Sequence, residues 1–113
     1  MTDVHVVYII GYNGEGQCGL NTEKDIEELT LISNKEITRF FPGYSQTIFG
    51  NDDLSKLWSA GFNDGGQCGI NNRNRDNIIK ATMIEYFDKH DIKIDRIYNH
   101  IIGERVFYVS KSA

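Results

Sequence analysis

The chain lacks several features that define large classes of protein. It has one proline, Pro42, and two cysteines, Cys18 and Cys68, in 113 residues. Two cysteines are too few for a disulfide scaffold or a four-thiolate zinc site. No apolar run approaches the ~20 residues of a membrane span, and no basic segment followed by an apolar stretch marks a secretory leader near residue 1. We therefore expect a cytoplasmic or nuclear protein without membrane association.

The sequence also lacks an excess of basic residues. Twelve lysines and arginines stand against sixteen aspartates and glutamates, which gives a formal net charge of −4. Proteins that bind nucleic acid by neutralising phosphates need a basic face, so we expect no direct nucleic-acid binding. The composition, 40% hydrophobic and 25% charged, is that of an ordinary globular protein. The length predicts a single domain over residues 1–113.

The most informative feature present is an internal repeat with an offset of 50 residues. Residues 7–20 return as residues 57–70, and the two repeat loops, at 11–20 and 61–70, share six identical residues. The six in the first loop are Gly11, Asn13, Gly16, Gln17, Cys18 and Gly19, and their counterparts in the second are Gly61, Asn63, Gly66, Gln67, Cys68 and Gly69. A period of 50 lies in the range of propeller blades and solenoid units. We therefore interpret the chain as a single two-repeat unit.

The segments between the loops favour short strands because they are rich in β-branched and aromatic residues. The expected strands are residues 4–10, 28–32, 36–41, 45–49, 55–60, 81–87, 92–97 and 105–109. Residues 22–32 also allow a short helix, and residues 71–77 are expected to form a polar loop. The prediction is an all-β fold.

The first loop also matches a dinucleotide-binding fingerprint, G-x-G-x-x-G, at Gly14, Gly16 and Gly19. It follows a strand-like run, as such a site requires. The second loop has Asp64 where the fingerprint needs its first glycine, yet it keeps the other repeated residues. The recurring pattern is therefore a different one, and a nucleotide site is the weaker interpretation.

A second alternative is a metal or redox site that joins Cys18 and Cys68, helped by His5, His90 or His100. Equivalent positions in two repeats would be separated by at least one repeat unit, and small buried cysteines are commonly core residues. We expect no metal, no cofactor and no catalytic residue.

The preferred interpretation of the repeated loop is structural. Its glycines allow positive φ or close backbone approach at a strand end. Its asparagine can bond to the loop's own backbone, and its glutamine can donate and accept across the loop. Its cysteine can fill a small apolar pocket.

The repeated loop resembles that of the regulator of chromosome condensation family, V-Y-x-W-G-x-N-x-x-G-Q-L-G. The matching positions are Val7, Tyr8, Gly11, Asn13, Gly16, Gln17 and Gly19, and then Trp58, Gly61, Asn63, Gly66, Gln67 and Gly69. The second family motif, I-x-x-I-x-x-G-x-x-H-T, is matched once, over residues 37–47. The sequence departs from the family where cysteine replaces the loop leucine in both copies, and where Gln46 replaces the histidine.

The resemblance implies a β-propeller of four-stranded antiparallel blades. In family order, the first two expected strands are the third and fourth of a blade. The next four form a complete blade, and the last two are the first and second strands of another. Two repeats cannot close a ring, but the terminal halves are complementary. We expect head-to-tail assembly of identical copies, as a trimer in the first instance and a tetramer in the second.

The function that the resemblance implies is a non-enzymatic scaffold for protein–protein interaction. The expected partners are further copies of the chain and a protein whose identity the sequence does not reveal. The alternatives are a structural subunit that completes a propeller in a larger assembly, a regulator of a small GTPase by family analogy, and a nucleotide-binding enzyme.

Overall fold

Short antiparallel strands form three separate sheets in the computed structural model, which describes residues 5–70, 75–99 and 105–111. A two-stranded sheet pairs β1 (Tyr8–Gly11) with β2 (Ile26–Leu31). A four-stranded sheet follows in chain order, with β3 (Arg39–Pro42), β4 (Gln46–Gly50), β5 (Leu57–Gly61) and β6 (Ile78–Met83). A second two-stranded sheet pairs β7 (Ile94–Asn99) with β8 (Val106–Ser110). The expectation of an all-β, antiparallel fold is confirmed.

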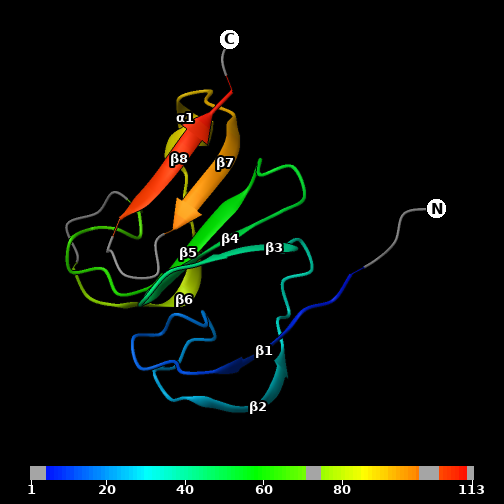
Figure 1. The fold of residues 1–113 in the computed structure, drawn as a ribbon, viewed down its shortest axis with the longest axis vertical. Helices are drawn as coiled ribbons and strands as arrows, with labels where there is room; N and C mark the ends of the chain where they lie inside the picture. Colours follow the sequence, from blue (N-terminus) through cyan, green and yellow to red (C-terminus); the bar gives the residue numbers. More distant parts are fainter. Residues whose placement is uncertain (1–4, 71–74, 100–104, 112–113) are drawn as a thin grey trace.

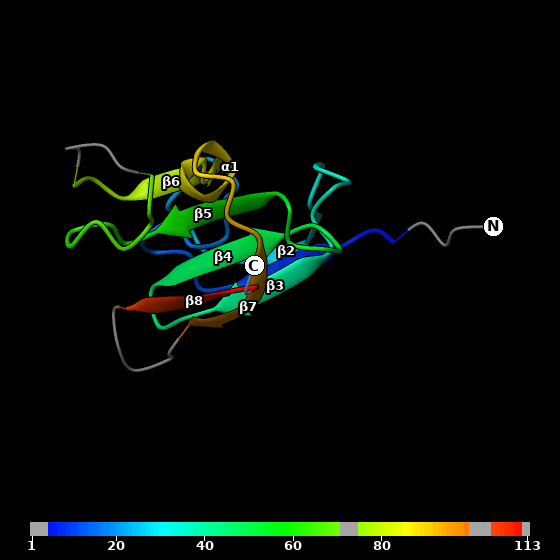
Figure 2. The same cartoon turned by 90° about the horizontal axis from the view of Figure 1, so that it is seen from above.

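The four-stranded sheet lies between the two smaller sheets, with β7–β8 on one side of it and β1–β2 on the other (Figure 1; Figure 2 gives the view from above). Two separate hydrophobic clusters fill the two gaps. One cluster joins Ile48 and Leu57 to residues of β7 and β8, including Ile97. The other joins Phe49 and Trp58 to residues of β1 and to the segments beside it. The core is therefore divided by the central sheet.

The central strands are buried on both faces, and the alternation of their side chains explains why. Ile48 contributes to the cluster beneath β7–β8, whereas its neighbour Phe49 contributes to the cluster beneath β1–β2. Successive residues of a strand point to opposite faces, so both faces of β4 need apolar side chains. All five residues of β5 are buried, for the same reason.

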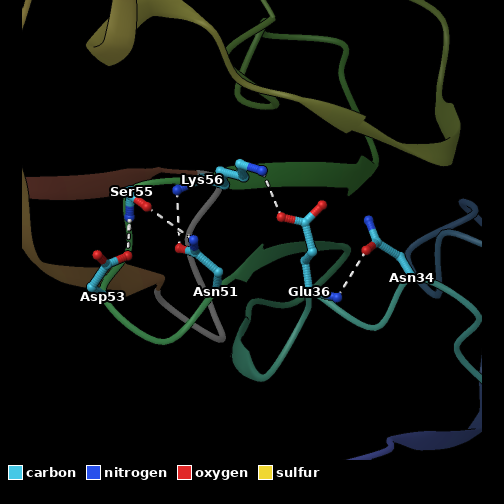
Figure 3. Close-up of polar contacts among 6 residues, drawn as sticks. All are labelled: Asn34, Glu36, Asn51, Asp53, Ser55 and Lys56. Atoms are coloured by element: carbon cyan, nitrogen blue, oxygen red, sulfur yellow. Dashed lines mark hydrogen bonds and ion pairs between the residues drawn. The ribbon is translucent and has the colours of Figure 1, made fainter.

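The turn between β4 and β5 is held by side chains that bond to its own backbone (Figure 3). Asn51 Oδ1 accepts from the backbone N–H of Lys56 at 3.0 Å, and Asn51 Nδ2 donates to Ser55 Oγ at 2.9 Å. Asp53 Oδ1 accepts from the backbone N–H of Ser55 at 3.1 Å. Lys56 Nζ also lies 2.6 Å from Glu36 Oε2, but both side chains are about half exposed, so this ion pair adds little stability.

The structure excludes one alternative and corrects the bounds of one expected strand. Residues 22–32 contain no helix, because 26–31 pair with β1 as a strand. The strand expected at 81–87 begins earlier, at Ile78, and ends at Met83. The one-turn helix α1 (Tyr86–Lys89) follows. Phe87 of this helix packs against the β7–β8 cluster, in which Ile84, two residues before the helix, is buried. Within the described residues, no helix has the length and apolar character to cross a membrane.

Candidate functional site

The two repeated loops have the same backbone conformation. Each contains three glycines with positive φ, at 130°, 79° and 72° in the first loop and at 118°, 76° and 71° in the second. These are Gly11, Gly16 and Gly19, and then Gly61, Gly66 and Gly69. The backbone N–H of Gly16 donates to the Asn13 carbonyl at 2.9 Å, and Gly66 donates to the Asn63 carbonyl at 3.0 Å. The sequence repeat is therefore also a structural repeat.

The asparagine of each loop is fully buried and fastens the loop to itself. Asn13 Oδ1 accepts from the backbone N–H of Cys18 at 2.8 Å, and Asn63 Oδ1 accepts from that of Cys68 at 3.2 Å. Asn13 Nδ2 also donates to the carbonyls of Thr22 at 2.8 Å and Lys24 at 3.0 Å. Buried polar groups need such partners, and one side chain here supplies three of them.

The glutamine of each loop closes a smaller turn. Gln17 Oε1 accepts from the backbone N–H of Glu15, and Gln67 Oε1 accepts from that of Gly65, at 2.9 Å in both cases. In the second loop the Gln67 carbonyl also accepts from Gln46 Nε2 at 3.2 Å. The glutamines thus satisfy backbone donors within the loops.

The cysteines of the two loops are free, buried thiols. Cys18 Sγ lies 3.6 Å from the Tyr12 carbonyl oxygen, and Cys68 Sγ lies 3.5 Å from that of Phe62. Burial raises the pKa of both thiols, so each thiol stays protonated at neutral pH. A reactive cysteine needs the opposite shift, because the thiolate is the nucleophile.

The structure does not assemble the metal or redox site considered as an alternative. In the described parts of the chain, no three residues among His, Cys, Asp and Glu are grouped closely enough to hold a metal ion. His5 is exposed, and His90 stacks on the Tyr86 ring with centroids 4.3 Å apart. His100 lies outside the described residues.

The context of the dinucleotide fingerprint also differs from that of a nucleotide site. Such a loop leads into a helix whose N-terminus binds the pyrophosphate. Here Gly14, Gly16 and Gly19 lie between two strands, and the chain continues into β2. The loop contacts β6 instead, since the Asn21 N–H donates to the Ile79 carbonyl at 2.8 Å. The first loop therefore packs one sheet against the next.

A hollow of about 370 Å³ lies between the β4–β5 turn and the α1 region. Its polar lining includes Asp53, Asp88, Asp91, Lys93 and Lys111, all of them exposed residues. Hydrogen bonds from the Ser55 hydroxyl and backbone lower the pKa of Asp53. The lowered pKa moves this carboxyl further from the neutral range in which a general acid or base works best.

The remaining candidate is a pair of apolar faces on the outer sides of the two small sheets. In the β1–β2 sheet the exposed apolar residues are Tyr8, Ile10, Leu29 and Leu31, and Val6 and Tyr12 flank β1. In the β7–β8 sheet they are Tyr98 and Phe107, which are 53% and 60% exposed. Sequence reasoning did not name these side chains as a surface. The sequence did contain a signal, because successive residues of these strands are apolar, whereas a strand buried on one face needs only alternate apolar residues.

Each small sheet also has open strand edges. β1 pairs only with β2, and β8 pairs only with β7, among the described residues. Open edges present unpaired backbone groups that readily accept another strand.

Comparison with known proteins adds no relative to this description. No family model matches the chain, and no curated protein matches it. The resemblance described above therefore depends on the motif residues themselves.

Proposed function

We propose that this chain is a non-enzymatic protein–protein interaction scaffold built from β-propeller repeats. Identical copies join head to tail into a closed ring, with three copies favoured over four. The central sheet is one complete blade, and each small sheet is half of a blade. The assembled ring then presents its loops and central channel to protein partners in the cytoplasm or nucleus.

One observation carries the proposal, namely that each small sheet has one packed face and one exposed apolar face. Ile9 of β1 and Val7, which precedes the strand, contact the chain's own core, while Tyr8 and Ile10 are 57% and 54% exposed. Monomeric proteins rarely leave contiguous apolar surface uncovered. In a ring every blade has a blade on each side, so both faces of every strand are covered.

Substitutions on the two faces, read by light scattering after gel filtration, test the proposal. Ile10→Asp and Phe107→Asp place a carboxylate on surfaces that are exposed in the single chain and buried in the ring. Both variants should stay folded and elute as single chains of 12.9 kDa, while the unmodified chain elutes at three or four times that mass. Burying an unpaired charge costs several kcal/mol, which is enough to prevent assembly.

Met83→Asp is the matched control. Met83 is 42% exposed, and it lies opposite Trp58 on the face that the chain's own β1–β2 sheet covers. This variant should keep the oligomeric mass. A single-chain mass for the unmodified protein would contradict the ring. Co-purification of a second repeat-bearing chain would favour the structural-subunit alternative instead.

A further inference from the structure

The pairing of β4 with β5 in the central sheet is a template for the contact that would join two copies. The repeat offset of 50 places β1 in register with β5, so that Tyr8 corresponds to Trp58 and Gly11 to Gly61. The glycine at the end of each strand has a similar φ, 130° in one and 118° in the other. β1 is therefore the structural equivalent of β5. Besides β6, β5 pairs with β4.

β8 is the equivalent of that partner. In the β3–β4 hairpin Phe40 pairs with Phe49, and in the β7–β8 hairpin Ile97 pairs with Tyr108. The sequences before these pairs match as well, since an isoleucine buried in the core stands three residues before both Phe40 and Ile97. Tyr108 thus occupies the position of Phe49.

From these two equivalences we infer that β8 of one copy pairs with β1 of a second copy, in the register that joins β4 to β5. Phe49 pairs with Trp58 in the central sheet, so Tyr108 pairs with Tyr8 of the second copy. Val106 then pairs with Ile10, and the other residues follow in antiparallel order. The partner is a second copy of this chain, and the inference rests on the proposed ring.

The burial of side chains in the single chain agrees with this register. Val106 and Tyr108 pack in the β7–β8 cluster, while Tyr8 and Ile10 are more than half exposed. Directly opposed residues in an antiparallel pair share one face of the sheet. The exposed pair of the second copy would therefore extend the first copy's own buried cluster.

The opposite face gives the same result. Phe107, 60% exposed, would lie opposite Ile9 of the second copy, which already packs in that copy's β1–β2 cluster. A slip of one residue would turn every one of these side chains to the wrong face. Only registers of the same parity cover Tyr8, Ile10 and Phe107 together, and the internal repeat selects one of these registers.

Charge favours the same head-to-tail orientation. Residues 5–32, which contain β1 and β2, carry five acidic residues and one lysine. Residues 92–111, which contain β7 and β8, carry four basic and two acidic residues. Units of opposite sign attract, whereas two copies of the same unit repel.

Register-specific disulfide trapping tests the pairing. Directly opposed residues have Cα atoms about 4.5 or 5.5 Å apart, within the range that a disulfide bridges. A chain with Tyr8→Cys is mixed with a chain with Tyr108→Cys and oxidised. We expect a disulfide-linked pair of chains on a non-reducing gel, which is lost on reduction and absent when either variant is oxidised alone.

Matched controls keep the Tyr8→Cys chain and move the second cysteine by one residue, to Phe107→Cys or Val109→Cys. These place the thiols on opposite faces, and the cross-link should be lost. Ile10→Cys with Val106→Cys provides a second pair in the expected register, in case Tyr8→Cys does not assemble. Light scattering before oxidation checks that each variant keeps the mass of the unmodified protein.

The outcomes separate the two proposals. A ring-sized mass with cross-linking only in the displaced pairs, or in neither expected pair, would overturn the register and leave the ring intact. A single-chain mass for the unmodified protein would overturn the ring, and the pairing with it. Cross-linking in either expected pair, without it in the displaced pairs, supports both.

Discussion

Replacing glycines in the first loop separates its structural role from a nucleotide-binding role. Gly16 has a φ of 79°, and a Cβ there would lie 2.7 Å from both Cα and Cγ2 of Ile79 in β6. A left-handed conformation costs an L-residue about 1–2 kcal/mol, and overpacking against a rigid strand costs about 1–3 kcal/mol more. Gly16→Ala should therefore lower the free energy of unfolding by about 2–5 kcal/mol.

Gly14 is the matched control, because it has no positive φ. A Cβ on Gly14 would meet only the outer end of the Tyr12 side chain, which is 64% exposed and able to move away. Gly14→Ala should change stability by no more than about 0.5 kcal/mol. Gly66→Ala is intermediate, at about 1–2 kcal/mol, because it combines a φ of 76° with a contact to the movable Arg75 side chain and so retains mainly the backbone cost.

Urea denaturation at a fixed protein concentration measures the three variants. Each kcal/mol corresponds to roughly 4–8 °C in melting temperature for a domain of this size, so thermal unfolding provides a second reading. The predicted order of damage is Gly16→Ala, then Gly66→Ala, then Gly14→Ala. Equal losses at Gly14 and Gly16 would refute the reasoning, because the fingerprint treats the two glycines alike and the structural loop does not.

Three further predictions concern the core of the loops and the assembly. Asn13→Ala removes three hydrogen bonds from a fully buried side chain and should cost about 2–4 kcal/mol, measured by urea midpoint; an unchanged midpoint contradicts this. Burial raises the pKa of Cys68 and Tyr108. Above about pH 9 the unfolded chain therefore binds fewer protons than the folded chain, and stability falls as the pH rises. A urea midpoint no lower at pH 10 than at pH 7 would contradict this prediction. The rate at which diluted chains assemble into rings, measured by stopped-flow light scattering, should fall as the salt concentration approaches about 1 M, because the Debye length there is only ~3 Å. A rate that does not depend on salt would contradict the proposed role of charge.

Strand locations could be predicted from the sequence because β-branched and aromatic residues alternate with turn residues. The expected strands at 45–49 and 55–60 differ by only one or two residues at each end from β4 (Gln46–Gly50) and β5 (Leu57–Gly61). The strand expected at 81–87 ends earlier than expected because α1 follows it. Ile84 and Phe87 both pack in the β7–β8 cluster, and the local sequence does not reveal such tertiary contacts.

The outer faces could not be predicted for a related reason. Val7, Tyr8, Ile9 and Ile10 are all apolar, so period-two alternation could not indicate which pair faces the core. The structure settles that Val7 and Ile9 pack inward and that Tyr8 is exposed. A strand with two apolar faces is typical of a sheet covered on both sides, which is the arrangement that the ring would complete.

Sedimentation of the unmodified protein over a wide range of concentrations tests the central claim most directly. Head-to-tail contacts that close give one discrete species, at three or four times the 12.9 kDa chain mass, whereas contacts that do not close give open chains that lengthen with concentration. The ring predicts a single oligomeric boundary that is independent of concentration. A single-chain mass throughout, or a continuous series of masses, would contradict it.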